Sequence, residues 1–321
     1  MAASVPKTTL KTHPQRSVID WLSVTIPAPE VTVEALLSYL RPAFGNIPLT
    51  INADGGLFGF KEQYRVFAHT EGMRRQIGSI SKGGESQAGR WLIVFSGVGC
   101  SMIDDWVQFV RLIKVLSPRV TRLDIAVDLP KGEYSVDDAV SMYQKKEFAV
   151  RGRNPGTRLA GDWLQGTGGR TLYVGNAQNG KMLRVYERGI KQGDPGSPAV
   201  RFEVQFTNRD RVIPLRVLLA SDAYFAGAYP PLAKILPVAA LPIATKRKEA
   251  VRSIAQRLRH LKQSYGRTID QALSAAGATD EELILLLRTP ESHCLISNHP
   301  ADWQEIKTQI QRDRATRKTT T

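Results

Sequence analysis

The segment that most restricts the fold of this chain is 171–189, TLYVGNAQNGKMLRVYERG, which has the pattern of a β-hairpin. Its first arm is rich in strand-forming residues, asparagines and a glycine follow as turn residues, and 182–186 returns as a second alternating run. Because alternate side chains of a strand point to opposite faces, this alternation predicts that Arg184, Tyr186 and Arg188 share one face.

A tyrosine between two arginines is a candidate nucleophile at a phosphate site. Nearby positive charge favours the phenolate, and arginine binds phosphate through two parallel hydrogen bonds. One alternative is a solvated hairpin whose tyrosine packs at the sheet edge. Another is that Tyr173, on the first arm, is the nucleophile, since the length of the turn does not settle whether it shares the face of Tyr186.

The run 120–129, VTRLDIAVDL, predicts a strand with two acids on its polar face. Asp124 and Asp128 are four residues apart, which corresponds to about 13 Å along a strand. Because that spacing is too long for both to bind one ion, Asp124 is the better metal ligand. Asp128 is then a strand-end cap or a group that supports the site.

A second acidic strand is predicted at 199–207, AVRFEVQFT, where Glu203 falls on the polar face. If this strand lies beside Asp124, the two carboxylates form an oxygen site. A cross-strand ion pair of Glu203 with Arg184 or Arg201 is the alternative. Asp20, inside the apolar run 18–26, is either a further ligand or a strand-end cap.

The ligand types present point to Mg²⁺ or Mn²⁺ if a metal is used. The sequence has two cysteines, far apart, and five histidines with neither an H-x-H pair nor an H-E-x-x-H motif. Cysteine- and histidine-based metal sites therefore have no local template, and oxygen ligands favour magnesium or manganese.

The charge balance predicts a polyanionic partner. Lysines and arginines number 44 against 30 acids, a net charge of +14. A membrane is not expected as a partner, because the apolar run 235–244 is short and interrupted by prolines and the N-terminus lacks the apolar core of a signal peptide. We therefore expect a cytoplasmic protein that binds a polyanion.

Residues predicted to bind DNA lie in two groups. Around the hairpin they are Arg170, Lys181 and Arg201. The second group lies on a basic amphipathic helix within 246–267, for which a membrane-surface or calmodulin-target helix is the alternative. Its members are Lys246, Arg247, Lys248, Arg252, Arg257, Arg259 and Lys262.

The predicted fold class is α+β, with a largely antiparallel sheet, helices packed on one face and a small basic helical C-terminal region. Loops are expected at 78–90 and 151–170, which are rich in glycine. The predicted parts are a flexible N-terminus (1–17), a catalytic domain (18–228), a proline-bearing linker (229–245) and a basic helical DNA-binding region (246–321).

Three of these segments, RLDIAVD at 122–128, the hairpin and RFEVQF at 201–206, together resemble the replication initiation factor family. Its members are rolling-circle replication initiators of plasmids and filamentous phages, and related relaxases of conjugative elements. The resemblance covers about residues 18–215. It implies that Tyr186 attacks a DNA phosphodiester and that Asp124 and Glu203, with Asp20 and Asp128, hold a divalent metal. Many members have a lysine where this chain has Arg188, which keeps the charge but cannot donate a proton.

The resemblance implies a function in which the chain nicks one strand at an origin, forms a 5′-phosphotyrosine link and a free 3′-hydroxyl, and later rejoins the strand. Host polymerase and helicase are candidate partners in the bacterial cytoplasm, and a homodimer is left open. A DNA-binding regulator without chemistry and a metal nuclease that uses water are the alternatives. A tyrosine recombinase is not favoured, because no R…H-x-x-R constellation precedes a late tyrosine.

Overall fold

The computed structural model describes residues 17–56, 59–87, 89–150, 152–164, 168–245, 254–275 and 279. The chain divides into two compact units, 1–246 and 247–321. Of the predicted N-terminal segment, only Ser17 lies within the described residues.

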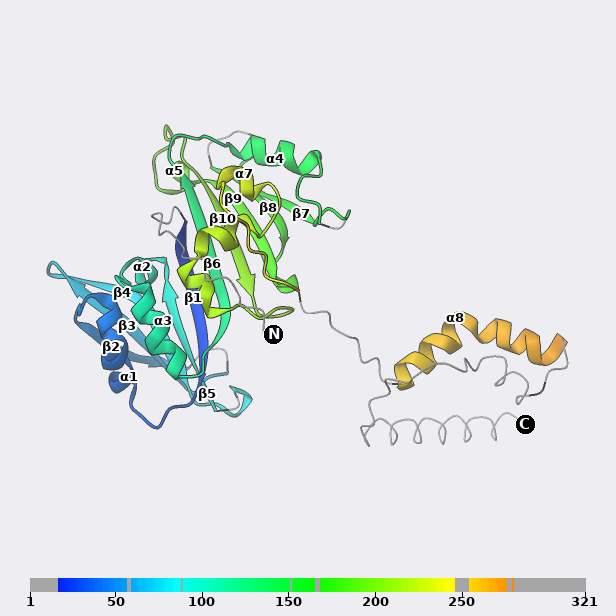
Figure 1. Ribbon diagram of the computed structural model, residues 1–321, viewed down its shortest axis with the longest axis horizontal. Coiled ribbons are helices and arrows are strands. Elements are labelled where there is room, and N and C mark those ends of the chain that lie inside the picture. Colours follow the sequence, from blue (N-terminus) through cyan, green and yellow to red (C-terminus); the bar gives the residue numbers. More distant parts are fainter. Residues whose placement is uncertain are drawn as a thin grey trace, which may run out of the picture. The chain divides into compact units, whose positions relative to one another are not determined.

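The first unit is built on a ten-stranded sheet in which every neighbouring pair of described strands is antiparallel (Figure 1). Consecutive strands form hairpins at both ends of the sheet, while β1, β6 and β10 come together in its centre from distant parts of the chain. In spatial order the strands are β2 (Leu49–Gly55), β3 (Glu62–Thr70), β4 (Met73–Lys82), β5 (Arg90–Ser96), β1 (Val18–Pro27), β6 (Arg119–Leu129), β10 (Val200–Thr207), β9 (Lys181–Glu187), β8 (Arg170–Asn176) and β7 (Thr157–Gly161).

Short helices connect and cover the strands. The main ones begin at side-chain caps, such as Ser135, which forms a reciprocal capping box with Asp138. The α-helices of this unit are α1 (Val33–Leu40), α2 (Gly97–Ser101), α3 (Trp106–Val115), α4 (Val136–Gln144), α5 (Arg188–Lys191), α6 (Ser221–Ala226) and α7 (Leu232–Ile235). Single 3₁₀ turns are η1 (Arg41–Phe44), η2 (Glu85–Gln87), η3 (Ala177–Asn179) and η4 (Leu215–Leu219).

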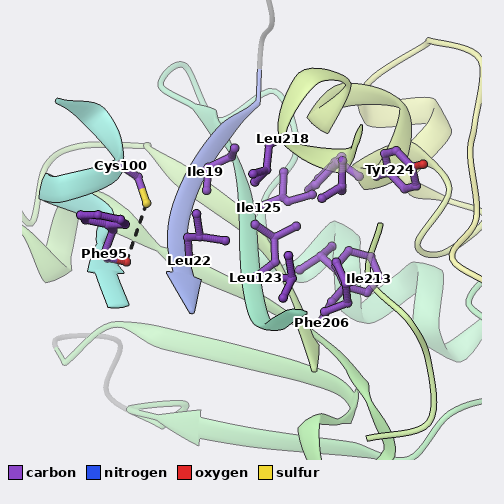
Figure 2. Packing of buried hydrophobic residues seen from close by; sticks show 14 of the residues in the cluster. Ile19, Leu22, Phe95, Cys100, Leu123, Ile125, Phe206, Ile213, Leu218 and Tyr224 are labelled. Carbon is purple, nitrogen blue, oxygen red and sulfur yellow. Dashed lines mark hydrogen bonds between the residues drawn. The ribbon is translucent and has the colours of Figure 1, made fainter. Parts of the chain in front are cut away.

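The core lies on one face of the sheet, between the central strands and these helices. Figure 2 shows Leu22 of β1 and Ile125 of β6 packed toward Leu218 of η4 and Tyr224 of α6. Burial of such apolar side chains is the main term that holds the layers together. The α+β prediction is therefore confirmed, and the opposite face of β6, β10 and β9 is left to polar residues.

The predicted hairpin is confirmed: β8 and β9 pair, η3 forms the turn, and Gly180 has the left-handed φ of 79° that the turn requires. The predicted loop at 78–90 is wrong in its first part, since Gly78–Lys82 continues β4. A side chain at Gly78 would place its Cβ 2.0 Å from the carbonyl oxygen of Val94. This glycine therefore permits close contact between strands rather than a turn.

The second unit is described over one helix, α8 (Ile254–Ala275). The sequence pattern predicts a separate short helix at 268–276, but α8 continues without a break to Ala275. The sequence pattern also predicts helices at 280–287 and 303–317, and both segments lie outside the described residues. In the part of the chain that the structure describes, no helix is long and apolar enough to cross a membrane.

Candidate active site

The pairing of three strands brings the predicted site residues to the polar face of the sheet. Arg201 of β10 lies opposite Asp128 of β6 and opposite Tyr186 of β9. Glu203 lies opposite Arg184 by the same register. Because directly opposed residues share a face, these side chains lie on one side of the sheet, together with Asp124.

Asp124 and Glu203 share one guanidinium. The Nη2 atom of Arg184 donates to Asp124 Oδ2 at 3.2 Å and also to Glu203 Oε1. Arg122 holds Asp124 from its own strand, with Nη2 at 2.5 Å from Oδ2. Asp124 is 1% exposed and Glu203 is 3% exposed, so both charges depend on these arginines for compensation.

A second group of charges surrounds Arg201. Its Nε and Nη2 atoms bind both oxygens of Asp128, at 2.6 and 2.7 Å, and its Nη1 binds Asp20 at 2.8 Å. The register of β1 against β6 shifts between Ile19 and Trp21, which leaves Asp20 as the extra residue of a bulge. Arg188 binds Asp128 from the start of α5, because β9 ends at Glu187. The alternation predicted for Arg188 stops one residue short of it.

Tyr186 is the phenol that meets this network. Its hydroxyl lies 3.5 Å from Glu203 Oε2, its side chain is 9% exposed, and the ammonium of Lys191 lies 4.6 Å from the ring centroid. Burial, followed by the charge of Glu203, raises the pKa of Tyr186 to about 12 despite Arg201 and Arg184. The expected stabilisation of the phenolate by arginines is therefore outweighed, and Tyr186 is neutral at physiological pH.

Glu203 is the group placed to receive a proton from that phenol. Burial raises its pKa above the usual range of a carboxyl, although Arg184 opposes this effect. A carboxylate with a raised pKa is a better base than an exposed one. The predicted alternative for Glu203, an ion pair with Arg184, is thus present, and it does not exclude a role as a base.

Tyr173 lies opposite Arg184, so it shares the face of Tyr186. The register question left open by the sequence is therefore resolved in favour of a shared face. The two phenols have different contacts, however: the Arg158 guanidinium lies 4.1 Å from the ring centroid of Tyr173, whereas Tyr186 contacts a carboxylate.

Of the predicted DNA-binding residues near the hairpin, Lys181 lies on the wrong face. It is paired with Phe206 of the apolar side, its ammonium lies 3.9 Å from the ring centroid of Tyr229, and burial lowers its pKa to about 8. Arg170 is bound by Glu187 and Asp137. Arg201 is bound by two acids, as described above.

The basic helix is only partly described. Lys262 lies on α8 and is exposed. Arg257 and Arg259 belong to α8, but their side chains lie outside what the structure describes, as do the whole residues Lys246, Arg247, Lys248 and Arg252.

Asp124 and Glu203 are suitable ligands for a hard divalent ion, because both carboxylates have an oxygen directed at the same position. That point is already contacted by the cationic Arg184. Among the described residues, no three acidic, histidine or cysteine side chains come close enough together to hold a metal. The metal ligands therefore stay a prediction, with Arg184 as a competitor for the same oxygens.

Two contributors were not singled out by the sequence pattern. Arg122 precedes Asp124 by two residues on the same face, so parity alone could have identified it. Lys191 reaches Tyr186 because the chain turns into α5 directly after β9, and no local pattern predicted that turn.

Comparisons with known proteins show the family to which this chain belongs. The model of the replication initiation factor family matches residues 118–285, more than half of the chain, and the chain therefore belongs to this family. This confirms the resemblance found in the sequence. The match includes β6 and β8–β10, the strands around the candidate site.

Two individual proteins are similar over different lengths. The chain is 29% identical over 112 residues to the putative DNA relaxase NicK of Bacillus subtilis (strain 168), which covers 32% of each protein, so the chain spans about a third of that relative's length. A solved structure of the rolling circle replication initiator protein from Geobacillus stearothermophilus is 20% identical, with a TM-score of 0.49, and covers 72% of this chain and 99% of that one.

Proposed function

We propose that this chain initiates rolling-circle replication by nicking one DNA strand at an origin, with Tyr186 as the nucleophile. The observation that carries the proposal is the contact of the Tyr186 hydroxyl with the buried carboxylate of Glu203, in a chain of the replication initiation factor family. A nucleophile in hydrogen-bond reach of a base that a third group orients, here Arg184, is the usual arrangement for covalent catalysis.

The proposed step balances as follows. Glu203 takes the phenolic proton, Tyr186 Oη forms a bond to phosphorus, and the bond from phosphorus to the 3′ oxygen breaks. The leaving oxygen takes up a proton and becomes a free 3′-hydroxyl, while the 5′ phosphate stays on the tyrosine. Because the energy of the phosphodiester is kept in the covalent link, the same residues can rejoin the strand by the reverse step.

Cationic groups around the phenol stabilise the charge that develops on phosphorus. Arg184 and Lys191 are both close to Tyr186, and Arg188 belongs to the same network because it binds Asp128. Fixed donors of this kind act most strongly in a partly desolvated site. The Nε atom of Arg184 is buried without a hydrogen-bond partner among the described residues, so this guanidinium is not saturated by its acids.

Mg²⁺ or Mn²⁺ is the cofactor that the family resemblance implies. Asp124 and Glu203 are the residues that would hold the ion, and it would supply Lewis-acid polarisation of the scissile phosphate. Both carboxylates are bound by Arg184 in this arrangement, so ion and guanidinium compete for them.

The partner proposed is DNA, as a single strand at the nick and as a duplex beside it. The net charge of +14 supports a polyanionic partner, and binding through phosphates should weaken steeply with salt. Residues 18–228 would carry the chemistry, 229–245 would be the linker and 246–321 would bind DNA. Host polymerase would extend the 3′-hydroxyl in the bacterial cytoplasm, after a helicase opens the strands.

The experiment that tests this is covalent capture from a pool of single-stranded oligonucleotides of random sequence. The full-length protein is incubated with the pool and divalent metal, and DNA that stays attached under denaturing conditions is sequenced. Trypsin separates the two phenols, because Tyr186 falls in peptide 185–188 and Tyr173 in peptide 171–181. We expect the nucleotide mass on 185–188, loss of capture in Tyr186→Phe, and retention in Tyr173→Phe.

The other outcomes identify the rivals. Nucleotide on peptide 171–181 would make Tyr173 the nucleophile. Cleavage without an attached strand would indicate a nuclease that uses water. Binding that is unchanged by Tyr186→Phe, with neither cleavage nor attachment, would leave a DNA-binding regulator.

A further inference from the structure

We infer that the cavity next to Asp20 binds one nucleobase of the strand that is cut, and so contributes to the choice of origin sequence. This inference rests on the proposed function. The cavity is formed where β1 meets the end of β5, α2 and the first turn of α3. Its volume is about 750 Å³, within the range of about 300–1,000 Å³ that is usual for small-ligand pockets.

Two tryptophans line this cavity, and the indole rings of both are held in place. Trp106 packs edge-on against the buried Phe109, with ring centroids 5.5 Å apart. Trp21 donates from Nε1 to Ser23 at 2.8 Å, and the Arg122 guanidinium lies 4.7 Å from its ring centroid. Rings fixed before binding lose little entropy when a base stacks on them, and such stacking contributes about 1–3 kcal/mol per base.

The charged residues of the lining favour a neutral group over a phosphate. They are Asp20, Asp128, Arg188 and Arg201, and their ion pairs engage all four. Two acids and two arginines leave no net charge, so a phosphate would find no unpaired cation in the lining. A nucleobase is neutral, apolar on its faces and polar at its edges. It is therefore complementary to a cavity that is lined by tryptophans and has polar residues at its rim.

Arg201 connects the cavity to the proposed nucleophile. It lines the cavity and lies opposite Tyr186 across the β9–β10 pair. The cavity and the phenol are therefore both next to Arg201. A strand whose phosphate is attacked at Tyr186 would have a neighbouring base next to the cavity.

The first test measures binding of dAMP, dCMP, dGMP and dTMP, each alone, to the full-length protein by saturation-transfer NMR, with 2-deoxyribose 5-phosphate as the ligand without a base. We expect transfer to base protons and at least tenfold weaker binding of the sugar phosphate, which is the lower part of the range that stacking supplies. Val98→Trp and Ser101→Trp should each block the cavity, because both residues line it and are exposed. Val115→Trp, exposed on α3 and outside the lining, is the matched control.

The second test links the cavity to the cut strand. DNA captured covalently by the native protein should show a base preference at a position close to the linked nucleotide, and Val98→Trp should remove it. Equal binding of nucleotides and sugar phosphate, or unchanged binding in both folded blocking variants, would overturn the inference. So would the same preference in native and Val98→Trp captures. Nucleotide binding does not require Tyr186, so a failure of strand transfer alone would be seen as binding without capture.

Discussion

Replacing Glu203 by Gln tests whether this residue acts as a base or only as a negative charge next to the proposed nucleophile, Tyr186. The carboxylate lies 3.5 Å from the Tyr186 hydroxyl. The charge of Glu203 is, after burial, the largest cause of the raised pKa of Tyr186. Its loss should therefore lower the pKa of Tyr186 from about 12 toward its ordinary value, while burial still keeps it raised.

The two roles predict opposite changes in rate. If Glu203 only raises the pKa of Tyr186, the variant has a more acidic phenol and forms the covalent link faster at pH 8. If Glu203 takes the proton, the variant is slower by about 10²–10⁴-fold even though its phenol is more acidic. We expect the second result. At pH 8 a phenol of pKa about 12 is ionised in about one molecule in 10⁴, so attack without a base would be slow.

The assay is the single-turnover rate of covalent attachment to a captured oligonucleotide at saturating DNA, measured from about pH 6 to 10. In Glu203→Gln the residual rate should keep rising with pH, because the phenol must ionise by itself. Glu187→Gln is the matched control, since it removes a carboxylate that lies on β9, the strand of Tyr186, and that binds Arg170 instead. A Glu203→Gln rate equal to or above the native rate, in a folded protein, would refute the assignment of the base.

Three further predictions concern stability. Between about pH 10 and 12 the unfolded chain loses the Tyr186 proton that the folded chain keeps. The unfolding free energy of the native protein should therefore fall by up to about 3 kcal/mol more than that of Tyr186→Phe over this interval. Equal pH dependence of the unfolding free energies of the two proteins, measured by urea titration, would contradict this prediction. Arg184→Ala leaves the buried carboxylates of Asp124 and Glu203 without part of their positive charge and should lower the unfolding free energy by about 3–5 kcal/mol. Mn²⁺ should restore part of this stability, because it should bind the variant more tightly than the native protein in calorimetry. Arg158→Ala is the control, and equal Mn²⁺ affinities of Arg184→Ala and the native protein would rule out competition between the ion and Arg184. Gly78→Ala should destabilise the first unit more strongly than Gly55→Ala, which adds a Cβ on β2 that meets no atom within 4 Å. Similar thermal unfolding of the two variants would contradict the close contact of Gly78 with Val94.

The sequence predicts the structure well where apolar and polar residues alternate regularly along a strand. The strands at 120–129 and 199–207 alternate clearly, and their pairing places Asp124 and Glu203 as expected. The sequence pattern does not predict the strands β2, β4 and β7, because glycine and polar residues hide the alternation and contacts from neighbouring strands decide the pairing. Tertiary contact thus overrides local composition there.

Charge alone was a poor guide to which cations are free. Lys181 was grouped with the arginines of the hairpin, although its odd position in β9 places it with Leu183 on the apolar face. Arg201 was expected to be available to DNA, and it is bound by Asp20 and Asp128 instead. The sequence of one strand does not predict its ion pairs with strands that are distant in the chain. Nor does it predict the burial of Tyr186, which sets the pKa of this residue.

The neutrality of the site gives a reason for keeping Tyr186, the proposed nucleophile, and Glu203, its proposed base, together in a buried pair. Four carboxylates and four arginines hold one another around Tyr186, so without DNA the phenol keeps its proton. An arriving phosphate is an additional acceptor for Arg184, whose Nη2 is shared between two acids. As Arg184 turns from Glu203 to the phosphate, the carboxylate loses its cationic partner and becomes a stronger base toward the phenol. Binding of the strand would therefore activate the nucleophile, which protects the protein from reaction before the origin is in place.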